Sequence, residues 1–304
     1  MSSAKNFIRR HKRLLSFAKA CKRAIHPVKH NWHVITFEDF FGLAVDWADM
    51  LPKDFDCILG VPRNGLLVAS VLALKMGKPL STADDFVRGI VWASRSSEKP
   101  SVYKRVLIVE DAVNSAHAMK EDIAKLKAYD ANLEVKTGCL FPQNPEMQNW
   151  IDYYYAISHD APAEWHMHSF FKDRVLAVDL DGVLLNEPTG NPLLLPTFPV
   201  EAVITARGES ERAKVESWLK SQGVSYKQLI MFDGDLNDRT VKRIAKYKSD
   251  QLLRVGAEWF WESEPDLSEA ICAIAKIPVY CPTNHKIYSS KSRWLQSFSN
   301  RKKK

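Results

Sequence analysis

Two carboxylates that lie two residues apart follow an apolar run in the middle of the chain. Residues 174–188 read RVLAVDLDGVLLNEP, so Asp179 and Asp181 stand at the end of a predicted buried strand. Two carboxylates with the backbone turned between them can do separable work, one as a nucleophile and the other as a general acid and base. The alternative is an acidic turn after a buried strand, without chemistry of its own.

A second acidic pair ends another predicted strand. Residues 106–119 read VLIVEDAVNSAHAM, which indicates a strand, a short turn and a helix. Glu110 and Asp111 can accept hydrogen bonds from the vicinal hydroxyl groups of a sugar. Asn114 and Ser115, with the N–H groups of the turn and the positive end of the helix dipole, can hold a phosphate. An ordinary acidic strand end followed by a helix cap would read the same way.

A glycine-flanked turn precedes this segment. Residues 60–65 read GVPRNG and also join a predicted strand to a helix, 45 residues before Glu110. The guanidinium of Arg63 can bridge the oxygens of a pyrophosphate, and glycines let the backbone approach such a group closely. Alone this turn is a weak signal, but its order relative to the acidic pair strengthens it.

The elements that must position these groups alternate between strand and helix. Short apolar strands and helices follow one another over residues 31–170, and the alternation restarts at residue 171 and runs to residue 281. This pattern predicts an α/β protein with two doubly wound parallel sheets, whose ligands lie beyond the carboxyl ends of the strands. In the segment 165–168, WHMH, the two histidines could be metal ligands, but their alternation favours a strand with polar residues on one face.

Positive charge is concentrated at the two ends of the chain. The net charge is +7, yet residues 1–30 hold nine Lys and Arg, residues 282–304 hold seven, and neither segment holds an acid, which leaves −9 for residues 31–281. An acidic body with basic ends is not the pattern of a nucleic-acid-binding core, so we expect no nucleic acid partner.

Residues 5–25 are predicted to form a basic amphipathic helix. Its apolar face carries Phe7, Leu14, Leu15 and Ile25, and Lys and Arg cover the opposite face. Such a helix either packs on its own domain with a solvated charged face or binds an anionic membrane surface or partner. The basic segment 282–304 is predicted to be a tail.

The remaining composition favours a cytoplasmic location, with peripheral attachment to the inner membrane as a second option. No run approaches the roughly 18 apolar residues of a membrane span, and the N-terminus lacks the apolar core of a secretory signal. The five cysteines are dispersed without a C-x-x-C pair, which argues against a disulfide framework and a structural zinc site.

The two turns together resemble the ligand loops of type I phosphoribosyltransferases. In that family an acidic pair precedes a phosphate loop, which implies that phosphoribosyl pyrophosphate (PRPP) binds here. The matching positions are Arg63, Asn64 and Gly65 of the first turn, and Glu110, Asp111, Asn114, Ser115 and Ala116 of the second. Ala116 and Ala118 depart from the family, which usually has Gly and a hydroxyl residue there.

The phosphoribosyltransferase resemblance also implies a reaction and a cofactor. An acceptor would attack C1 of PRPP, with magnesium pyrophosphate as the leaving group. Residues 88–104 occupy the position of the family's mobile catalytic loop, with Arg95 as a candidate within it, although a solvated charge run would look alike.

The segment around Asp179 resembles the first motif of the haloacid dehalogenase (HAD) superfamily of phosphatases. This resemblance implies that Asp179 forms an aspartyl phosphate, that Asp181 is the acid and base, and that Mg²⁺ binds Asp179, the backbone carbonyl of Asp181 and Glu262. Further motif positions fall in order along the chain. They are Thr205 and the neighbouring Arg207 for the phosphoryl group, Lys248 with Lys242 and Lys246 as rivals, and Asp266 as a second acidic candidate.

Only 25 residues separate Asp181 from Arg207. This is too few for a folded cap, so the phosphatase site is predicted to be open and suited to a large or carrier-attached substrate.

Three functions remain open from the sequence. The first is transfer of 5-phosphoribose to a glycan or lipid-linked hydroxyl followed by removal of the 5-phosphate; here the chain is similar to bacterial transferase–phosphatase fusions for ribofuranose-containing surface polysaccharides. The second is nucleobase phosphoribosylation with an attached nucleotide phosphatase. The third is a regulatory domain that binds PRPP without turnover.

Overall fold

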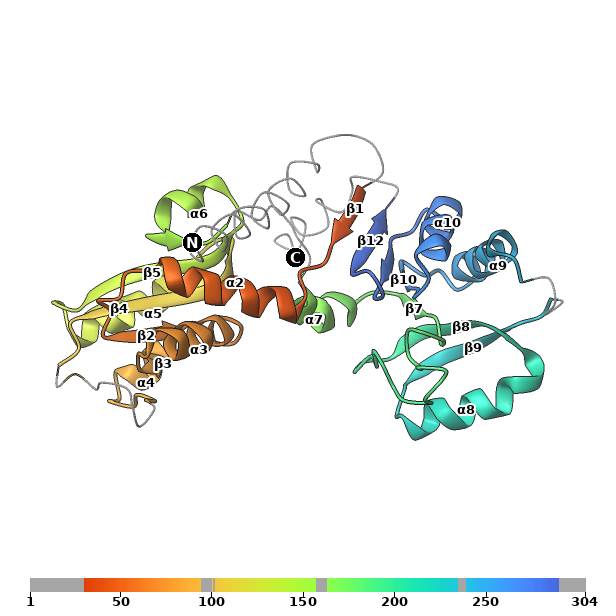
Figure 1. Cartoon of the computed structure of the whole chain (residues 1–304), viewed down its shortest axis with the longest axis horizontal. Coiled ribbons are helices and arrows are strands. Elements are labelled where there is room, and N and C mark those ends of the chain that lie inside the picture. The colour runs from red at the N-terminus through yellow and green to blue at the C-terminus, as the bar shows by residue number, and fades with distance from the viewer. Residues whose placement is uncertain (1–29, 94–99, 101, 157–162, 235–238, 290–304) are drawn as a thin grey trace, which may run out of the picture. The chain divides into compact units, whose positions relative to one another are not determined.

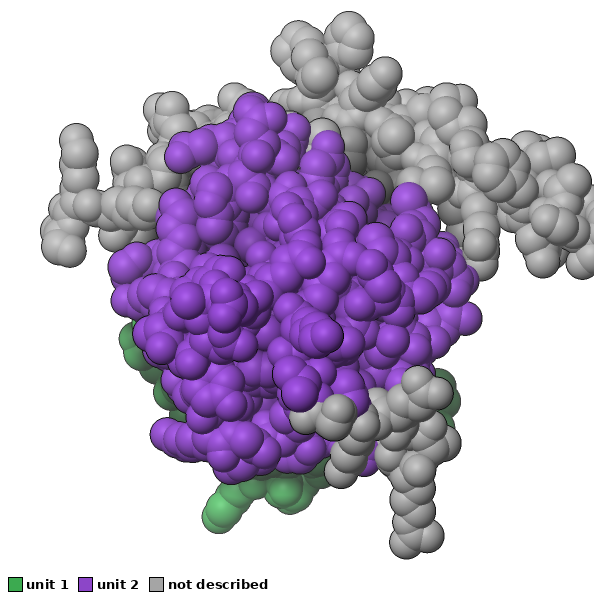
Figure 2. Space-filling model, turned by 90° about the vertical axis from the view of Figure 1, so that its left-hand side faces the viewer, with its two compact units in different colours: residues 1–36, 161–304 green, residues 37–160 purple. Residues whose placement is uncertain are grey.

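The computed structural model describes residues 30–93, 100, 102–156, 163–234 and 239–289. The chain forms two compact units, coloured separately in Figure 2. Unit 1 consists of residues 1–36 and 161–304, and unit 2 consists of residues 37–160. Each unit is built on its own β-sheet, whose elements are labelled in Figure 1.

Unit 2 contains a five-stranded sheet in the order β3-β2-β4-β5-β6, and all its strand pairs are parallel. The predicted α/β fold with a parallel sheet is confirmed for this unit. Its strands are β2 (Cys57–Gly60), β3 (Leu80–Ser81), β4 (Arg105–Val113), β5 (Glu134–Pro142) and β6 (Tyr153–Tyr154). Its helices are α2 (Phe37–Met50), α3 (Gly65–Met76), α4 (Ala83–Phe86), α5 (His117–Tyr129) and α6 (Pro145–Trp150).

Both faces of this sheet are covered. Leu59 and Ile108 belong to a core that includes Met119 of α5, whereas Ile58 and Leu107, one position along each strand, are also fully buried. Successive side chains of a strand point to opposite faces. The strands therefore read as continuous apolar runs because helices shield the sheet on both sides.

Unit 1 contains a seven-stranded sheet in the order β1-β12-β11-β10-β7-β8-β9. Its strands are β1 (His30–His33), β7 (Leu176–Val178), β8 (Val200–Gly208), β9 (Tyr226–Phe232), β10 (Trp259–Trp261), β11 (Val279–Cys281) and β12 (Lys286–Ser289). Its helical elements are η1 (Glu164–His166), α7 (Met167–Phe171), η2 (Glu209–Glu211), α8 (Arg212–Ser221), α9 (Val241–Arg254) and α10 (Pro265–Ala275).

The prediction that this second sheet is parallel throughout is wrong, because the sheet is mixed. Five neighbouring strands are parallel, but β12 runs antiparallel to β11, and β1 runs antiparallel to β12. The reason is the short connection at residues 282–285. A parallel pair needs a crossover of a dozen or more residues, whereas a short turn joins antiparallel strands.

Two helical layers enclose the parallel part of this sheet, as Figure 1 shows. Ile204 and Ile230 pack with Ile244 of α9 and Ile271 of α10. Val178 and Val203 pack with residues of α8 in a second core. The helix α9 begins after Thr240, whose side chain accepts a hydrogen bond from the backbone N–H of Arg243. Such a cap satisfies an N–H group that the first helical turn leaves unpaired.

The compact units divide the chain at other positions than the predicted domains do. The strand β1 falls in the predicted first domain, but it extends the sheet of unit 1 by pairing with β12. Residues 165–168 are also helical rather than extended, since they lie in η1 and α7. Aromatic packing buries the end of this helix, because Phe171 contacts both Trp259 and Trp261 edge to face.

Several predictions concern segments outside the described residues. They are the amphipathic helix at residues 5–25, Arg95, and most of the basic tail from residue 290 onward. Among the helices that the structure does describe, none combines the length and the apolar character needed to cross a bilayer.

Candidate functional sites

In unit 2 the two predicted ligand turns lie side by side at a topological switch point. The chain leaves β2 toward β3 on one side, and β4 pairs with β2 on the other side. In open α/β sheets the crevice at such a point is where ligands bind. The turn after β2 and the turn after β4 therefore flank the same crevice.

Gly65 makes this close approach possible. A Cβ atom at Gly65 would lie 2.6 Å from the carbonyl oxygen of Val109 and 3.1 Å from the Cα of Glu110. Any larger residue would push the first turn away from the end of β4. Gly65 therefore sets the spacing between the two turns.

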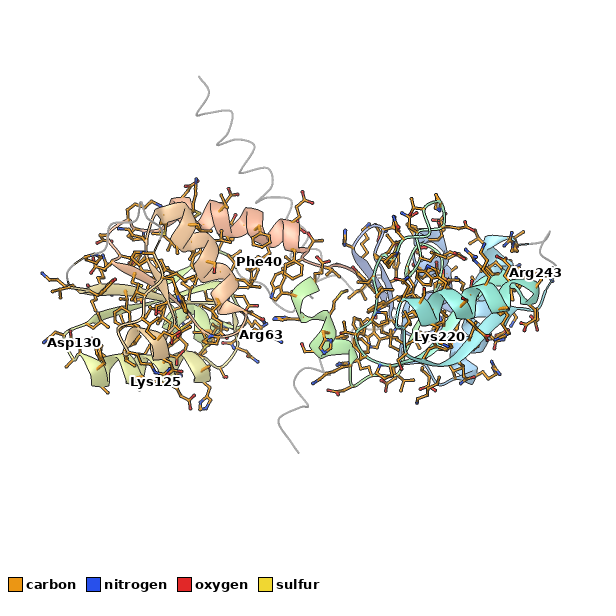
Figure 3. The ribbon with its side chains drawn as sticks, turned by 90° about the horizontal axis from the view of Figure 1, so that it is seen from below. Phe40, Arg63, Lys125, Asp130, Lys220 and Arg243 are labelled. Carbon is orange, nitrogen blue, oxygen red and sulfur yellow. The ribbon has the colours of Figure 1, made fainter. Side chains whose placement is uncertain are left out.

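Arg63 projects from the first turn at the surface of unit 2 and is labelled in Figure 3. Its Nε donates a hydrogen bond to Oδ1 of Asn64 at 3.2 Å. Asn64 stands at the N-terminus of α3 without capping it through its side chain. An exposed guanidinium beside a helix N-terminus is an arrangement that can receive an anion.

The strand β4 continues beyond the predicted end and includes the acidic pair. It runs to Val113, so Glu110 and Asp111 are strand residues rather than turn residues. Their side chains therefore point to opposite faces. Asp111 is buried, with 3% of its surface exposed, whereas Glu110 is half-buried. That both carboxylates contact the hydroxyl groups of one sugar stays a prediction, and Glu110 is the more accessible of the two.

The environment of Glu110 favours its protonated form. Burial raises the pKa of Glu110 to about 7, and the nearby carboxylates of Asp111 and Asp122 contribute to the same shift. A carboxyl group with such a pKa can act as donor or acceptor near neutral pH.

The turn after β4 is held by a residue that the sequence did not indicate. The side-chain nitrogen of Asn144 donates to the backbone oxygen of Asn114 at 2.8 Å and to its Oδ1 at 3.1 Å. Asn144 also caps α6 by accepting from the backbone N–H of Met147. Its place before Pro145, at the start of a helix, is the signal that could have found it.

Ala116 adopts a left-handed backbone conformation, with φ 52° and ψ 22°. This conformation suits glycine, since a Cβ atom strains it. The structure thus explains why the resembling family carries Gly at this position. Asn114 and Ser115 are exposed in the same turn.

Unit 1 has its own switch point, between β7 and β10. Three predicted site residues meet there. Lys248 Nζ lies 2.9 Å from Asp179 Oδ2 and 2.7 Å from Glu262 Oε2. All three are buried, and Glu262 and Lys248 are 0% and 2% exposed. One ammonium group therefore bridges two carboxylates inside the protein.

The choice among the three candidate lysines depends on the faces of α9. Lys248 faces the sheet, whereas Lys242 and Lys246 are exposed. Lys246 pairs with Asp250 on the surface. Of the three, Lys248 is the one that contacts Asp179.

Electrostatics at this cluster are dominated by burial. Burial raises the pKa of Asp179 well above its ordinary value, the Lys248 ammonium opposes that rise, and Glu262 adds to it. The pKa of Lys248 is raised by its two carboxylate partners, which outweigh the cost of burying its charge. The lysine is therefore ionised and holds Oδ2 of Asp179 in place.

Asp181 is bound by Arg207 rather than by the Asp179 cluster. Arg207 Nη2 and Nε donate to Asp181 Oδ1 and Oδ2 at 2.7 and 2.9 Å. Arg207, which is 7% exposed, also contacts Glu187 and Glu211. The sequence indicated Arg207 only as a secondary contact to the phosphoryl group. In the structure its guanidinium makes a bidentate contact with Asp181, the predicted acid and base.

The turn after Asp179 is tightly packed. Gly182 has φ +72°, and a Cβ atom there would lie 2.4 Å from Ser263 Oγ. Ser263 Oγ in turn donates to the backbone oxygen of Asp181 at 3.0 Å. This serine, which the sequence did not single out, ties the loop of β10 to the loop of β7.

Thr205 and Asp266 are placed differently. Thr205 lies fully buried near the carboxyl end of β8, and its Oγ1 accepts a hydrogen bond from the backbone N–H of Arg207 at 3.1 Å. Asp266 is exposed in the first turn of α10. No contact in the described residues joins Asp266 to Asp179.

The residues predicted to bind Mg²⁺ do not form a cation site in this arrangement. Glu262 uses one carboxylate oxygen for Lys248 and the other for the backbone N–H of Glu264. The backbone oxygen of Asp181, which is the predicted ligand at this position, accepts a hydrogen bond from Ser263 Oγ, and the Asp181 carboxylate is bound by Arg207. Within the described ranges, no group of three His, Cys, Asp or Glu side chains is arranged to hold a metal ion. The set of Asp179, Asp181 and Glu262 therefore does not fit a metal as it stands.

The connection between β7 and β8 leaves this cluster without a cap. Residues 179–199 are all described and contain turns and isolated bridges, with neither a helix nor a strand of the sheet. That the site is open, which the spacing between Asp181 and Arg207 indicates, stays a prediction.

Comparison with known proteins bears on the first part of the chain. Residues 43–168 match the family described as phosphoribosyl transferase domain. No curated protein matches the chain significantly.

Among solved structures, the chain is similar to xanthine-guanine-hypoxanthine phosphoribosyltransferase of Helicobacter pylori, with 13% identity, 44% of this chain and 92% of that chain covered, and a TM-score of 0.33. It is also similar to purine phosphoribosyltransferase of Pyrococcus horikoshii, with 22% identity, coverage of 43% and 89%, and a TM-score of 0.31. The family match, together with the two turns at the switch point, supports a type I phosphoribosyltransferase domain in this part of the chain, with PRPP as its substrate.

Proposed function

We propose that unit 2 transfers 5-phosphoribose from PRPP to a hydroxyl group of a glycan acceptor, and that unit 1 then removes the 5-phosphate. The transfer rests on the family match and the paired turns. The hydrolysis rests on one observation, the buried cluster of Asp179, Lys248 and Glu262 at the switch point of the second sheet.

The two reactions fit together chemically. Transfer forms a bond between C1 of the ribose and the acceptor oxygen and releases pyrophosphate, so the product keeps a phosphate monoester at C5. Hydrolysis of that monoester consumes water and releases phosphate. The sum is an unphosphorylated ribofuranosyl group on the acceptor.

In unit 2 the protein mainly positions PRPP and stabilises charge. Arg63 would hold pyrophosphate oxygens, and the turn of Asn114 and Ser115 would hold the 5-phosphate. Glu110 would accept a hydrogen bond from a ribose hydroxyl. These contacts would stabilise an oxocarbenium-like transition state by fixing its charged parts. PRPP carries Mg²⁺ on its diphosphate as part of the substrate.

In unit 1 Asp179 would attack phosphorus through Oδ1 while Lys248 holds Oδ2. An aspartyl phosphate would form and the ribose oxygen would leave. Asp181 would donate a proton to that oxygen and would then take a proton from the attacking water. To do so it has to leave Arg207 and take up a proton from water before the first step, and the freed guanidinium and Thr205 would contact the phosphoryl oxygens.

The open connection between β7 and β8 favours a large acceptor. A small nucleotide phosphatase gains from an enclosing cap, which excludes water, and residues 179–199 supply none. Nucleobase phosphoribosylation and PRPP binding without turnover stay as the competing functions.

The variant Asp179→Asn separates the two steps. Incubated with PRPP and a lipid-linked glycan, it is expected to release pyrophosphate at the wild-type rate and to accumulate a phosphoribosylated product, detected by mass spectrometry. Phosphate release should fall by roughly 10³-fold or more, as for loss of a nucleophile. The exposed Asp250→Asn serves as the matched control.

Each competing function predicts another result. Pyrophosphate release with a nucleobase but with no glycan would support nucleobase transfer. PRPP binding without pyrophosphate release with either acceptor class would support the regulatory reading. Equal loss of both activities in folded Asp179→Asn would refute the assignment of two separate sites.

A further inference from the structure

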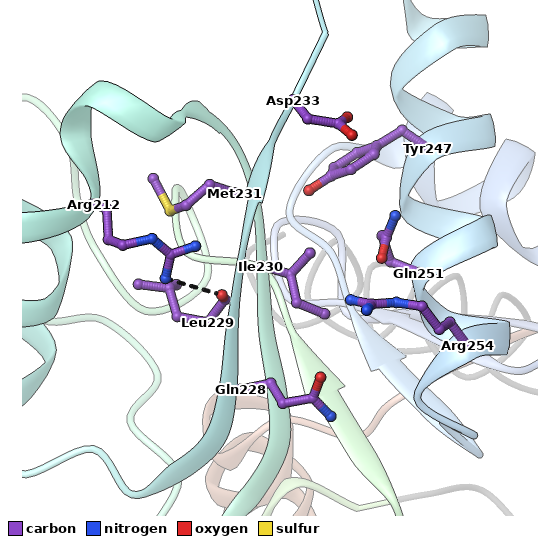
Figure 4. A pocket seen from close by; sticks show the side chains of 9 residues that line it. All are labelled: Arg212, Gln228, Leu229, Ile230, Met231, Asp233, Tyr247, Gln251 and Arg254. Carbon is purple, nitrogen blue, oxygen red and sulfur yellow. Dashed lines mark hydrogen bonds between the residues drawn. The ribbon is translucent and has the colours of Figure 1, made fainter.

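An open groove runs along β9, the last strand of the sheet in unit 1. Its volume is about 510 Å³, and side chains from β9, α8 and α9 line it. Figure 4 shows Tyr247, Gln251 and Arg254 reaching from α9 toward the strand, with Arg212 on the other side of it. None of the residues assigned above to catalysis lines this groove.

Tyr247 presents a buried polar atom to the groove. Its side chain is 9% exposed, and its hydroxyl has no hydrogen-bond partner among the described residues. The ring is held by edge-to-face contact with Phe232, with 5.0 Å between the centroids. A buried hydroxyl without a partner costs free energy in the empty protein, and a ligand that bonds to it recovers that cost.

More unused hydrogen-bonding groups surround this hydroxyl. Gln228 on β9 and Gln251 on α9 line the groove, as do Arg254 and Asp233. In the part of the chain that the structure describes, none of these four side chains makes a hydrogen bond or ion pair. Amides both donate and accept, guanidinium donates, and carboxylate accepts.

The charge of the groove is close to balanced. Arg212 is already engaged, since it pairs with Glu209 and Glu216. The positive charge of Arg254 is offset by the negative charge of Asp233. A phosphate or another strong anion would therefore find no net attraction here, because anion sites are built from surplus positive charge.

The edge of β9 is also partly closed to another strand. Arg212 Nη1 donates to the backbone oxygen of Leu229 at 3.2 Å, as the dashed line in Figure 4 marks. A peptide that added to the sheet would need that oxygen for its own backbone hydrogen bond. A side chain that occupies an edge carbonyl is one way in which proteins prevent strand addition.

We propose that this groove binds a neutral saccharide. Vicinal hydroxyl groups each donate and accept, which matches a balanced set of amides, one guanidinium, one carboxylate and one phenol. The open shape admits a chain longer than one sugar. Only the biological role of the groove rests on the proposed function. In that role the groove would give a glycan acceptor a second point of attachment.

The variant Tyr247→Phe tests the proposal. It removes the oxygen and keeps the ring, so the free energy of unfolding should be unchanged or higher, because no hydrogen bond is lost. Binding of neutral oligosaccharides, measured by isothermal titration with a panel of hexose and pentose chains, should weaken about threefold to tenfold, as for one hydrogen bond. Tyr129→Phe, at an exposed tyrosine of unit 2, is the matched control.

Further measurements decide the remaining outcomes. Arg254→Ala should weaken saccharide binding yet leave hydrolysis of p-nitrophenyl phosphate unchanged, so failure of the groove and failure of the phosphatase are told apart. If no member of the panel binds, or if Tyr247→Phe binds as well as wild type, the proposal is overturned. Binding of pyrophosphate or of an extended peptide that depends on Tyr247 would overturn it as well.

Discussion

The two switch points hold their charged groups in different ways. In unit 1, Lys248 and Glu262 are almost fully buried and contact each other and Asp179 without a ligand. In unit 2, Arg63, Asn114 and Ser115 are exposed at the ends of turns. The side chains of the first cluster are therefore fixed by burial and by contacts with one another, whereas those of the second are held only by the backbone of their turns. Nucleophilic attack requires a fixed carboxylate, whereas an ester of pyrophosphate can be held by adaptable turns.

The largest effect is expected from a substitution that disrupts the buried cluster of Asp179, Lys248 and Glu262. Lys248→Met removes the cation between Asp179 and Glu262 and leaves two buried carboxylates without their shared positive charge. Removing one partner of a buried ion pair typically costs about 3–5 kcal/mol. Hydrogen exchange in the strands of unit 1 should report a loss of that size, while the strands of unit 2 should keep their protection.

Lys246→Met is the matched control, because Lys246 lies on the same helix and pairs with Asp250 at the surface. Its effect on the free energy of unfolding should stay within about 0.5 kcal/mol. Equal effects of the two substitutions would contradict the view that the cluster of unit 1 is a buried electrostatic element.

A smaller effect concerns the pH dependence of unit 2. The pKa of Glu110 is about 7 in the folded protein against an ordinary value of 4.5. Because the folded state holds the proton more tightly, no penalty applies below pH 4.5. As pH rises from 4.5 through 7, the free energy of unfolding falls, because the ionised carboxylate has to stay half-buried in the folded protein.

Glu110→Gln should therefore become more stable relative to wild type by roughly 2 kcal/mol between pH 4.5 and 8, since one pKa unit is about 1.4 kcal/mol and partial exposure reduces the effect. Denaturant unfolding, monitored by hydrogen exchange in β4 at each pH, measures this difference in the free energy of unfolding. A difference that does not change with pH would show that the environment of Glu110 is no less solvated than that of an ordinary surface carboxylate.

Binding by the exposed turn should depend on Arg63 without any effect on the fold. Arg63→Ala is expected to weaken PRPP binding by about 1.5 kcal/mol, or roughly tenfold, as for one hydrogen bond to a charged group. Calorimetric titration with PRPP measures this, and Lys75→Ala, at an exposed position of α3, is the control. Unchanged affinity would remove Arg63 from the site.

The smallest effect tests the strain in the phosphate turn. Ala116→Gly relieves the left-handed conformation and should raise the free energy of unfolding by up to about 1 kcal/mol. Ala118→Gly, two residues on in the first turn of α5, should lower it by about the same amount because glycine weakens a helix. If both substitutions destabilise the protein, packing of the buried Ala116 side chain outweighs its backbone strain.

The sequence located both candidate sites because their signals are local. A buried strand followed by Asp179, and a strand end followed by Asn114 and Ser115, can be read from neighbouring residues. The same is true of the parallel sheet of unit 2, since each strand and helix carries its own pattern of apolar residues. The Trp165–His168 segment shows the limit of this reading, because a four-residue alternation fits a strand and a single helical turn equally well.

The remaining features of the sites and of the sheet of unit 1 depend on contacts between residues that are distant in the sequence. Spacing in the sequence favoured Lys248 over Lys242 and Lys246, but its contact with Asp179 comes from the packing of α9 on the sheet. The grip of Arg207 on Asp181 and the support of the Asn114 turn by Asn144 join residues 26 and 30 positions apart. The pairing of β1 with β12 joins the two ends of the described chain. Local patterns in the sequence determine which helices and strands form and where reactive groups lie along the chain. Which side chains and strands contact one another depends on burial and on the distances between elements, and only the folded chain defines these.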